Sequence, residues 1–309
     1  MDTAVQRFVA PQLQNIASND LCRNVGDVSP YGRRLPQPAL FAVDIDGTFL
    51  SAEPEVRRKN RAAFANALKA GYNVFFCTGR PHVSSMAVLD EQFVRSTGYR
   101  GYPGVYHNGA VVYDGSGTVL RMTVFGTSFL TAFCEFLVSQ QLDKYAAFCD
   151  MNGAYMICHD NSCMKEILED VDIRDPPTVV TPADLLLKQI SLIIIHHKEI
   201  LTQQTHLKCD VDYVLKEGSF GAWDVTPCTS TKAEGLKVLL DSYGVSNADC
   251  GFIGNGTNDV EAMTLCDLSF AVQNSEANVK EYAKYTLAET NDEGAFHTVM
   301  KLVYGVPCD

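Results

Sequence analysis

A short apolar run that ends abruptly in a polar turn most constrains what this chain can fold into. Residues 39–44 read Ala-Leu-Phe-Ala-Val-Asp, and the polar turn continues to Thr48. An apolar run of this length fits a β-strand that is buried on both faces. Residues 54–70 then predict a helix, because Pro54 suits a first turn and apolar residues recur along one side. A second strand over 72–77 completes a strand–helix–strand unit, which predicts a parallel sheet.

The last third of the chain repeats this alternation. We expect helices over 233–243, 276–283 and 293–303, and strands over 251–253, 268–272 and 285–288. The segment between about 126 and 216 has a different pattern, because Asn152-Gly153 separates two apolar runs and so indicates a tight hairpin. A helix over 129–140 and a strand over 190–195 flank these runs. The sequence therefore predicts an α/β fold in which a second α/β domain is inserted into the first.

These patterns set the expected domain boundaries. The length of 309 residues agrees with two domains. We expect an N-terminal extension over 1–37, one domain built from 38–125 and 217–309, and the inserted domain over 126–216.

Charge and composition exclude several classes of protein. The formal net charge of −12 disfavours broad binding to nucleic acid or to an anionic membrane surface. No apolar stretch approaches the roughly 20 residues of a membrane-spanning helix, and the first residues lack the apolar core of a secretory signal. The 11 cysteines are scattered without a CxxC pair, which favours free thiols in a reducing compartment. We expect a cytoplasmic protein.

Two carboxylates stand at the end of the first buried strand, in the motif Asp44-Ile-Asp46-Gly47-Thr48. Open α/β sheets bind their ligands at the carboxyl ends of strands. Two carboxylates two residues apart, with a glycine that permits a sharp turn, can hold one hard cation and face one substrate. Taken alone, the motif also fits an ordinary solvated turn.

Three more polar clusters close a predicted strand or open a helix. Thr78-Gly79-Arg80 offers a hydroxyl, backbone N–H groups and a planar fork for phosphate oxygens. Lys232 stands at a helix start, where the dipole disfavours a cation unless an anion is near. Residues 254–259 read Gly-Asn-Gly-Thr-Asn-Asp and supply oxygen ligands on a flexible backbone. Each cluster alone also fits a capped turn, and their combination points to phosphoryl chemistry.

In their order along the chain, these four motifs resemble those of the haloacid dehalogenase superfamily. They are similar in particular to the Cof-type sugar-phosphatase branch, and the resemblance extends from about residue 39 to 303. It includes the segment that begins His107-Asn108-Gly109. The resemblance implies a Rossmann-like parallel-sheet core and, over about 126–216, a C2-type cap that selects the substrate. It also implies a phosphomonoester hydrolase that forms an aspartyl-phosphate and requires Mg²⁺.

The resemblance assigns roles to individual residues. Asp44 would be the nucleophile, and Asp46 would protonate the leaving alkoxide and then activate water. Thr78 would bind the phosphoryl group, and Lys232 would steady both that group and Asp44. The remaining expected substrate or phosphate contacts are Gly47, Thr48, Gly79, Arg80, Asn108 and Asn258. The expected metal ligands are Asp44, Asp46, Asn255 and Asp259.

One residue departs from the family pattern. Where the family usually has Gly-Asp, this chain has Gly254-Asn255, so a neutral amide replaces an acidic metal ligand. Either Asn255 binds the ion, with Asp259 behind it, or Asp259 binds it directly. We expect a phosphatase of small phosphorylated metabolites such as sugar phosphates. A phosphosugar phosphotransferase or mutase of the same fold is the nearest alternative, and a binding protein with a weakened metal site is the other.

Overall fold

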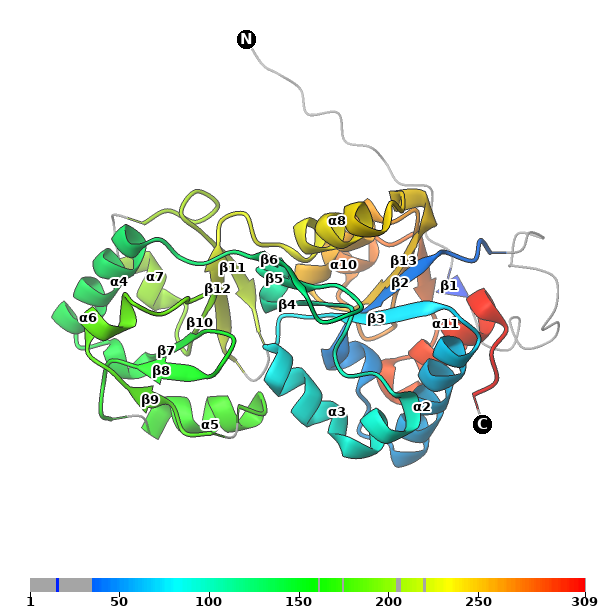
Figure 1. The fold of residues 1–309 in the computed structure, drawn as a ribbon, viewed down its shortest axis with the longest axis horizontal. Coiled ribbons are helices and arrows are strands. Elements are labelled where there is room, and N and C mark those ends of the chain that lie inside the picture. Colours follow the sequence, from blue (N-terminus) through cyan, green and yellow to red (C-terminus); the bar gives the residue numbers. More distant parts are fainter. Residues whose placement is uncertain are drawn as a thin grey trace, which may run out of the picture.

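The computed structural model describes residues 15–16, 35–160, 162–173, 175–203, 207–218 and 221–308. Two β-sheets, each flanked by helices, lie side by side along the long axis of the molecule (Figure 1). The first sheet contains the strands before residue 123 and after residue 249, and the second contains those between. This arrangement confirms the predicted α/β fold with a parallel-sheet core and an insert.

The first sheet is mostly parallel. Its order is β1 (Asn15–Ile16), β15 (Tyr285–Leu287), β14 (Leu268–Ala271), β13 (Cys250–Gly254), β2 (Leu40–Val43), β3 (Asn73–Cys77), β4 (Gly104–Tyr106), β5 (Val111–Tyr113) and β6 (Val119–Met122). Only two of its strand pairs, β4–β5 and β5–β6, are antiparallel. Strand β2 lies between β13 and β3, and the chain runs outward from it in both directions.

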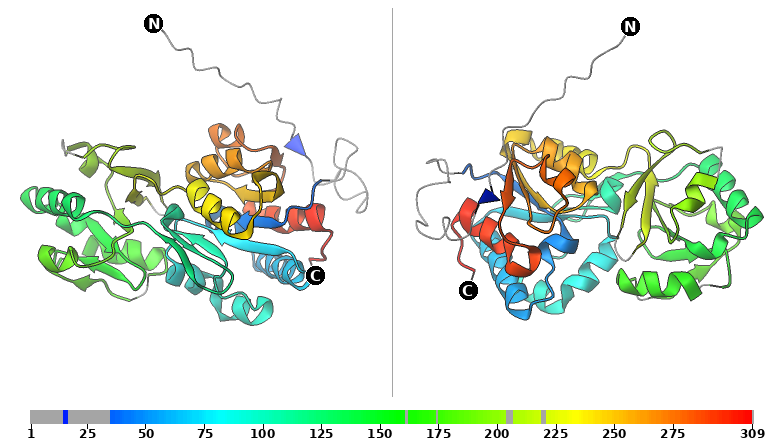
Figure 2. Two further views of the ribbon diagram at one scale, coloured as in Figure 1. Left: turned by 45° about the horizontal axis from the view of Figure 1, so that its top comes forward. Right: turned by 180° about the vertical axis from the view of Figure 1, so that it is seen from behind.

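Helices cover both faces of this sheet (Figures 1 and 2). One face carries α2 (Pro54–Lys69), α3 (His82–Thr97) and α11 (Ala295–Tyr304), and the other carries α8 (Lys232–Tyr243), α9 (Val260–Leu265) and α10 (Ala277–Lys280). Because both faces are covered, the central strands are buried throughout, which explains their unbroken apolar sequences.

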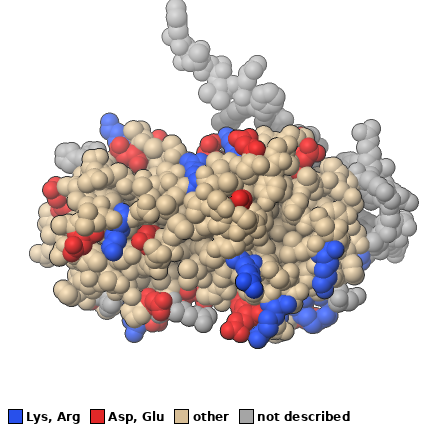
Figure 3. Space-filling view, viewed as in Figure 1, with Lys and Arg blue, Asp and Glu red and all other residues tan. Residues whose placement is uncertain are grey.

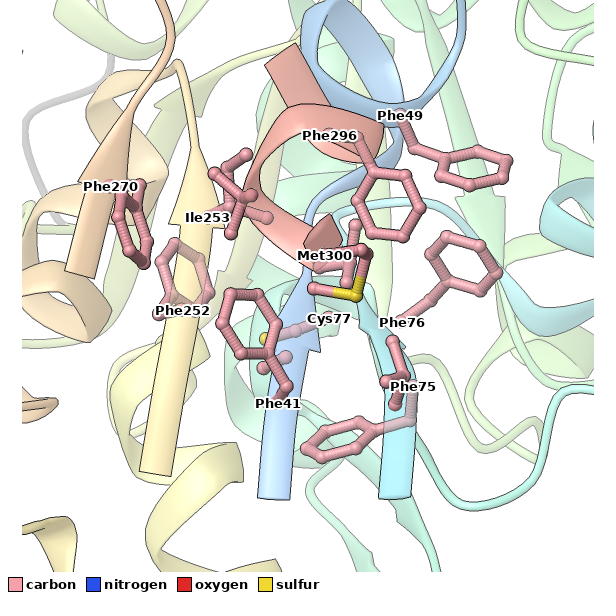
Figure 4. Close-up of a cluster of buried hydrophobic side chains, with 14 of the residues drawn as sticks. Phe41, Phe49, Phe75, Phe76, Cys77, Phe252, Ile253, Phe270, Phe296 and Met300 are labelled. Carbon is pink, nitrogen blue, oxygen red and sulfur yellow. The ribbon is translucent and has the colours of Figure 1, made fainter. Parts of the chain in front are cut away.

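Aromatic side chains fill the layer between the sheet and helices α2 and α11 (Figure 4). The ring of Phe49 lies 5.0 Å from that of Phe76 and 4.9 Å from that of Phe296, both edge to face. Such pairs add about 0.5–1.5 kcal/mol each beyond the burial of their area. Phe49 ends the turn that carries Asp44 and Asp46, so this packing holds that turn against the core.

The second sheet has the order β11 (Tyr213–Glu217), β12 (Trp223–Pro227), β10 (Leu192–Ile195), β7 (Ala146–Cys149), β8 (Ala154–Met156) and β9 (Thr178–Val179). Its helices are α4 (Thr127–Ser139), α5 (Ser162–Asp170), α6 (Pro182–Leu185) and α7 (Glu199–Gln203). Strands β7 and β8 pair antiparallel across Asn152-Gly153, so the predicted hairpin is confirmed.

Three expectations from the sequence differ from the structure. The helix predicted over 276–283 is only the short α10, because the chain turns again after Lys280. The second sheet runs on to Pro227, beyond the predicted boundary at 216, because β11 and β12 pair with each other and β12 pairs with β10. The sequence did not predict helices α3, α5, α6, α7 and α9 or strands β5, β6, β9, β11 and β12. Apart from β1, the expected extension over 1–37 lies almost wholly outside the described residues.

The surface carries charge of both signs. On the face shown in Figure 3, acidic and basic side chains are interspersed. Within the described ranges, no helix combines the length and apolar character needed to cross a membrane. The ten cysteines that the structure describes are all free.

Candidate active site

The four predicted motifs meet at one edge of the first sheet. They follow the carboxyl ends of β2, β3 and β13, or open α8, which begins beside them. The chain leaves β2 toward β3 on one side, and β13 lies on the other side of β2. Such a switch in strand order opens a crevice in which α/β proteins bind ligands. The four motifs therefore lie together at one edge of the first sheet.

The turn after β2 presents Asp44 to this crevice. Its backbone N–H donates to the carbonyl of Ile253 over 3.0 Å, which ties the turn to β13. Gly47 has a φ of +67°, a left-handed conformation that glycine adopts without strain. The side-chain amide of Asn274 donates to the Gly47 carbonyl over 2.9 Å. The position of the Asp44 carboxylate is therefore fixed from two sides.

Lys232 joins two carboxylates. It is the first residue of α8, and its ammonium donates to Asp44 Oδ1 and Asp259 Oδ1, each over 2.6 Å. The Lys232 side chain is fully buried, and Asp44 is only 5% exposed. A buried cation is stable only when paired in this way. These contacts explain how a lysine can begin a helix here.

Burial and the neighbouring charges shift the pKa values of both Asp44 and Lys232. Burial raises the pKa of Asp44, Lys232 lowers it, and the charges of Asp259 and Asp46 raise it further. Burial opposes the charge of Lys232, but Asp259 and Asp44 together raise its pKa above the usual value. Lys232 therefore stays charged across the physiological range and opposes the effect of burial on Asp44, whose pKa is nevertheless raised to about 7.

Both carboxylate oxygens of Asp259 already accept hydrogen bonds. Its Oδ1 accepts from Lys232, and its Oδ2 accepts from the backbone N–H groups of Asn255 and Gly256, both over 2.9 Å. The side chain of Asn255 lies against the first motif, where its Oδ1 accepts from the Thr48 hydroxyl over 3.1 Å. Asp259 thus shapes the loop that presents Asn255.

Thr78 and Gly79 follow β3 and face the same crevice. The Thr78 N–H donates to the Val105 carbonyl, and its hydroxyl accepts from the Arg80 N–H over 3.2 Å. Gly79 is required because a Cβ there would come within 2.9 Å of Asp224 Oδ2 and 3.0 Å of Asn108 Nδ2. The lack of a side chain at Gly79 therefore lets Asp224 and Asn108 pack directly against this turn.

The guanidinium of Arg80, which we expected to face a phosphate, holds Asp46 instead. Its Nε and Nη2 donate to the two Asp46 oxygens over 2.7 and 2.8 Å. Its Nη1 reaches the insert just after α5, where it donates to the Val171 carbonyl over 2.7 Å and to Asp172 Oδ2 over 3.2 Å. Arg80 thus connects the carboxylate of Asp46 to the insert.

A cavity of about 350 Å³ lies between the two sheets at this edge. Asp44, Asp46, Thr78 and Arg80 line it from the first sheet, and Leu192, Ile194, Ala222 and Asp224 line it from the second. Asn108 lies behind this wall, where it donates to Asp224 and accepts from the Asn258 side chain over 3.0 Å. The cavity is large enough for a small metabolite.

The structure places every predicted site residue in or beside this crevice. The sequence did not single out Asp224, Asp172 or Asn274. Asp224 lies on β12, a strand that the sequence did not predict, and it belongs to no recognisable motif. Only its position next to Trp223 in a short run of β-formers hinted at a strand.

The sequence is similar to a known family and to curated members of it. The sequence model of the haloacid dehalogenase-like hydrolase family matches residues 41–299. The chain is 23% identical to the 5-amino-6-(5-phospho-D-ribitylamino)uracil phosphatase YwtE of Bacillus subtilis, over 86% of this chain and 98% of the relative. It is 25% identical to the Escherichia coli enzyme of the same name, YbjI, over 85% and 96% of the two chains.

Solved structures show the same fold. A HAD/COF-like hydrolase from Plasmodium vivax superposes with a TM-score of 0.78 at 24% identity, covering 87% of this chain and 96% of the other. The HAD subclass IIB sugar phosphatase BT4131 superposes with a TM-score of 0.69 at 18% identity, covering 85% and 97%. The resemblance seen in the motifs and the prediction of an enzyme are thereby confirmed. The chain belongs to the haloacid dehalogenase-like hydrolases.

Proposed function

We propose that this protein is a Mg²⁺-dependent phosphatase of small phosphorylated metabolites, sugar phosphates in particular, and that it acts through an aspartyl-phosphate on Asp44. The observation that carries the proposal is the buried ammonium of Lys232, 2.6 Å from Asp44 at the wall of the cavity. A phosphoryl group repels a carboxylate nucleophile, so attack requires positive charge beside both groups.

The first step forms the aspartyl-phosphate. In the described part of the chain, Asp44 Oδ2 accepts no hydrogen bond, and Asp44 lines the cavity, so this oxygen is available to attack phosphorus. The bond from phosphorus to the leaving oxygen breaks as the new bond forms, and Asp46 donates a proton to that oxygen. In the second step Asp46 takes a proton from water as the water attacks phosphorus, which releases phosphate and restores Asp44.

Arg80 must release Asp46 for this exchange of protons. The bidentate contact occupies both Asp46 oxygens. Because Arg80 also contacts Val171 and Asp172 of the insert, a movement of the insert would change the grip of Arg80 on Asp46. We propose on this basis that the second sheet and its helices form a cap domain whose position controls access to the site.

The donor set suits Mg²⁺. The Asp44 carboxylate, the Asp46 main-chain carbonyl and the Asn255 amide oxygen are hard oxygen ligands on neighbouring turns, and the Thr48 hydroxyl orients Asn255. Within the described residues, no group of three or more His, Cys, Asp or Glu side chains is placed to hold a metal. The site would thus rely on one side-chain carboxylate, with Asp259 supporting Asn255 from behind. Bound there, Mg²⁺ would neutralise charge on the transferring phosphoryl group.

A generic aryl phosphate tests the proposal. We expect turnover with Mg²⁺, loss of turnover with EDTA, and none in Asp44→Asn, because a carboxamide is not a nucleophile. Asp241→Asn, an exposed change on α8, is the matched control. Activity that survives in Asp44→Asn would refute the mechanism. Retention of the phosphoryl group on an added sugar would indicate a phosphotransferase instead.

The role of Asp46 has its own test. Asp46→Asn should slow hydrolysis of alkyl phosphates far more than hydrolysis of p-nitrophenyl phosphate, because an aryl leaving group needs little protonation. The values of kcat/KM for the two esters measure the difference, because kcat/KM reports formation of the aspartyl-phosphate and not its later hydrolysis, which is common to both esters. Equal losses on both would show that Asp46 is not the acid.

A further inference from the structure

Asp224, a carboxylate of the second sheet, lines the cavity, and only one of its two oxygens accepts a hydrogen bond from a described residue. Asp224 Oδ2 accepts from Asn108 Nδ2 over 2.9 Å, which fixes the orientation of the group. No donor reaches Oδ1 from the residues that the structure describes. Two glycines leave room around the group, since a Cβ on Gly218 would lie 3.2 Å from Oδ1 and one on Gly79 would lie 2.9 Å from Oδ2. Asp224 is therefore held rigidly with one oxygen open to the cavity.

The surroundings of Asp224 are apolar. It pairs with Ile194 across β10, so the two side chains share one face of the sheet. Leu192, two residues before Ile194 on β10, lies on that face as well. Ala222, just before β12, also lines the cavity with them. Burial there raises the pKa of Asp224 to about 7, and the hydrogen bond from Asn108 opposes this shift. A polar group in such a wall gains strongly from a hydrogen-bond donor.

Nearby cations are already engaged. Lys216, opposite Asp224 on β11, donates to Glu261 over 2.8 Å. Arg80 is the one basic residue among the described residues that line the cavity, and it is bound to Asp46 and Asp172. Asp224 and Glu217 both line the cavity from the second sheet. Above about pH 7, where Asp224 is ionised, a leaving group in contact with this wall therefore meets negative charge and apolar surface.

We propose that Asp224 determines which leaving group the enzyme accepts: its Oδ1 accepts a hydrogen bond from a hydroxyl of an uncharged, hydroxylated leaving group. The same charge disfavours leaving groups that carry a second phosphate or a carboxylate. This inference rests on the proposed phosphatase activity. In this account, residues of the first sheet bind the phosphoryl group, and Asp224 of the second sheet recognises the leaving alcohol.

Matched pairs of esters test the inference. Glycerol 1-phosphate and n-propyl phosphate differ only in hydroxyl groups, as do sorbitol 6-phosphate and n-hexyl phosphate. The measured quantity is kcat/KM for the hydroxylated ester divided by kcat/KM for the bare ester. Asp224→Ala should lower this ratio about 10- to 100-fold, the usual range for a hydrogen bond to a charged group. Asp224→Asn, which keeps shape and loses charge, should improve hydrolysis of fructose 1,6-bisphosphate relative to fructose 6-phosphate.

The controls separate this inference from the phosphatase proposal. Glu166→Gln, an exposed change on α5, should leave both ratios unchanged. Suppose that the wild type hydrolyses aryl phosphate but neither Asp224 variant changes these kcat/KM ratios. That result would overturn the role of Asp224 and leave the phosphatase proposal standing. Equal losses on both members of each pair would also overturn it, because they would indicate a merely structural role. Failure of the wild type to hydrolyse aryl phosphate would overturn both proposals.

Discussion

The two sides of the cavity differ in whether their charged side chains are paired. On the first-sheet side, Lys232, Asp44 and Asp259 are buried and joined by contacts of 2.6 Å. On the second-sheet side, the wall is mostly apolar, and one oxygen of Asp224 accepts no hydrogen bond from any described residue. A network with paired charges fixes one geometry, which suits a phosphoryl group that is the same in every substrate. An apolar wall with one open acceptor can discriminate among leaving groups, which differ from substrate to substrate.

The largest effect should come from breaking the paired network. Lys232→Met would leave two buried carboxylates without their cation, so turnover of every ester should fall at least about 100- to 1,000-fold. The free energy of unfolding should fall by about 3–5 kcal/mol. Lys237→Met, at an exposed position on the same helix, is the control. Unequal losses among esters would contradict the division of labour between the two sides.

The pH dependence of stability tests the contact between the buried His107 of the first domain and Ser191 of the insert. His107 Nδ1 lies 2.7 Å from the Ser191 hydroxyl of the insert, and burial lowers the pKa of His107 to about 4 against the opposing charge of Asp150. The folded state therefore takes up this proton at lower pH than the unfolded state, whose value is near 6.5. The associated stability is present above pH 6.5 and is lost as pH falls toward 4, by about 3 kcal/mol.

Urea unfolding across this range measures that loss. The stability of the wild type relative to His107→Gln should decrease by about 3 kcal/mol between pH 6.5 and 4. His159→Gln, at an exposed position, should show no such change relative to the wild type. If the difference in free energy of unfolding between the wild type and His107→Gln does not change with pH, His107 is not held neutral at its contact with Ser191.

The fourth motif offers a smaller change on the first-sheet side. Asn255→Asp should lower the Mg²⁺ concentration for half activity about 10-fold, because it adds a charged ligand. Asp259→Asn should raise that concentration about 10- to 100-fold, because it removes the acceptor that shapes the Asn255 loop. Asn247→Asp, an exposed change, is the control. Mg²⁺ titrations that do not shift in either variant would place the metal elsewhere.

The smallest effect should come from the contact between the sides. Asp172→Asn weakens the ion pair with Arg80, and asparagine tolerates the φ of +58° at this position. The pair is only partly buried, so we expect about a fivefold rise in KM with little change in kcat. Asp170→Asn, exposed at the end of α5, is the control. An unchanged KM would show that this contact does not hold the insert in place.

The sequence predicted the first-sheet side far better than the second. Apolar strands that end in polar motifs predict that those motifs meet, because parallel strands place their carboxyl ends at one edge. The contact between Lys232 and Asp44, 188 residues apart, was expected only through the family resemblance. Strand β12 and Asp224 were missed because residues 211–227 mix charges, glycine and proline without clear alternation. The grip of Arg80 on Asp46 was missed because a guanidinium fits a phosphate or a carboxylate equally well.

The central claim is that Asp44 carries the phosphoryl group between substrate and water. Asp46→Asn should slow hydrolysis of the aspartyl-phosphate more than its formation from p-nitrophenyl phosphate, so the intermediate should accumulate. Rapid acid quench followed by peptide mass spectrometry locates it. We expect a phosphoryl group on Asp44 in this variant and none in the variant that also carries Asp44→Asn. A phosphoryl group on any other residue, or turnover without a phosphorylated protein, would contradict the account.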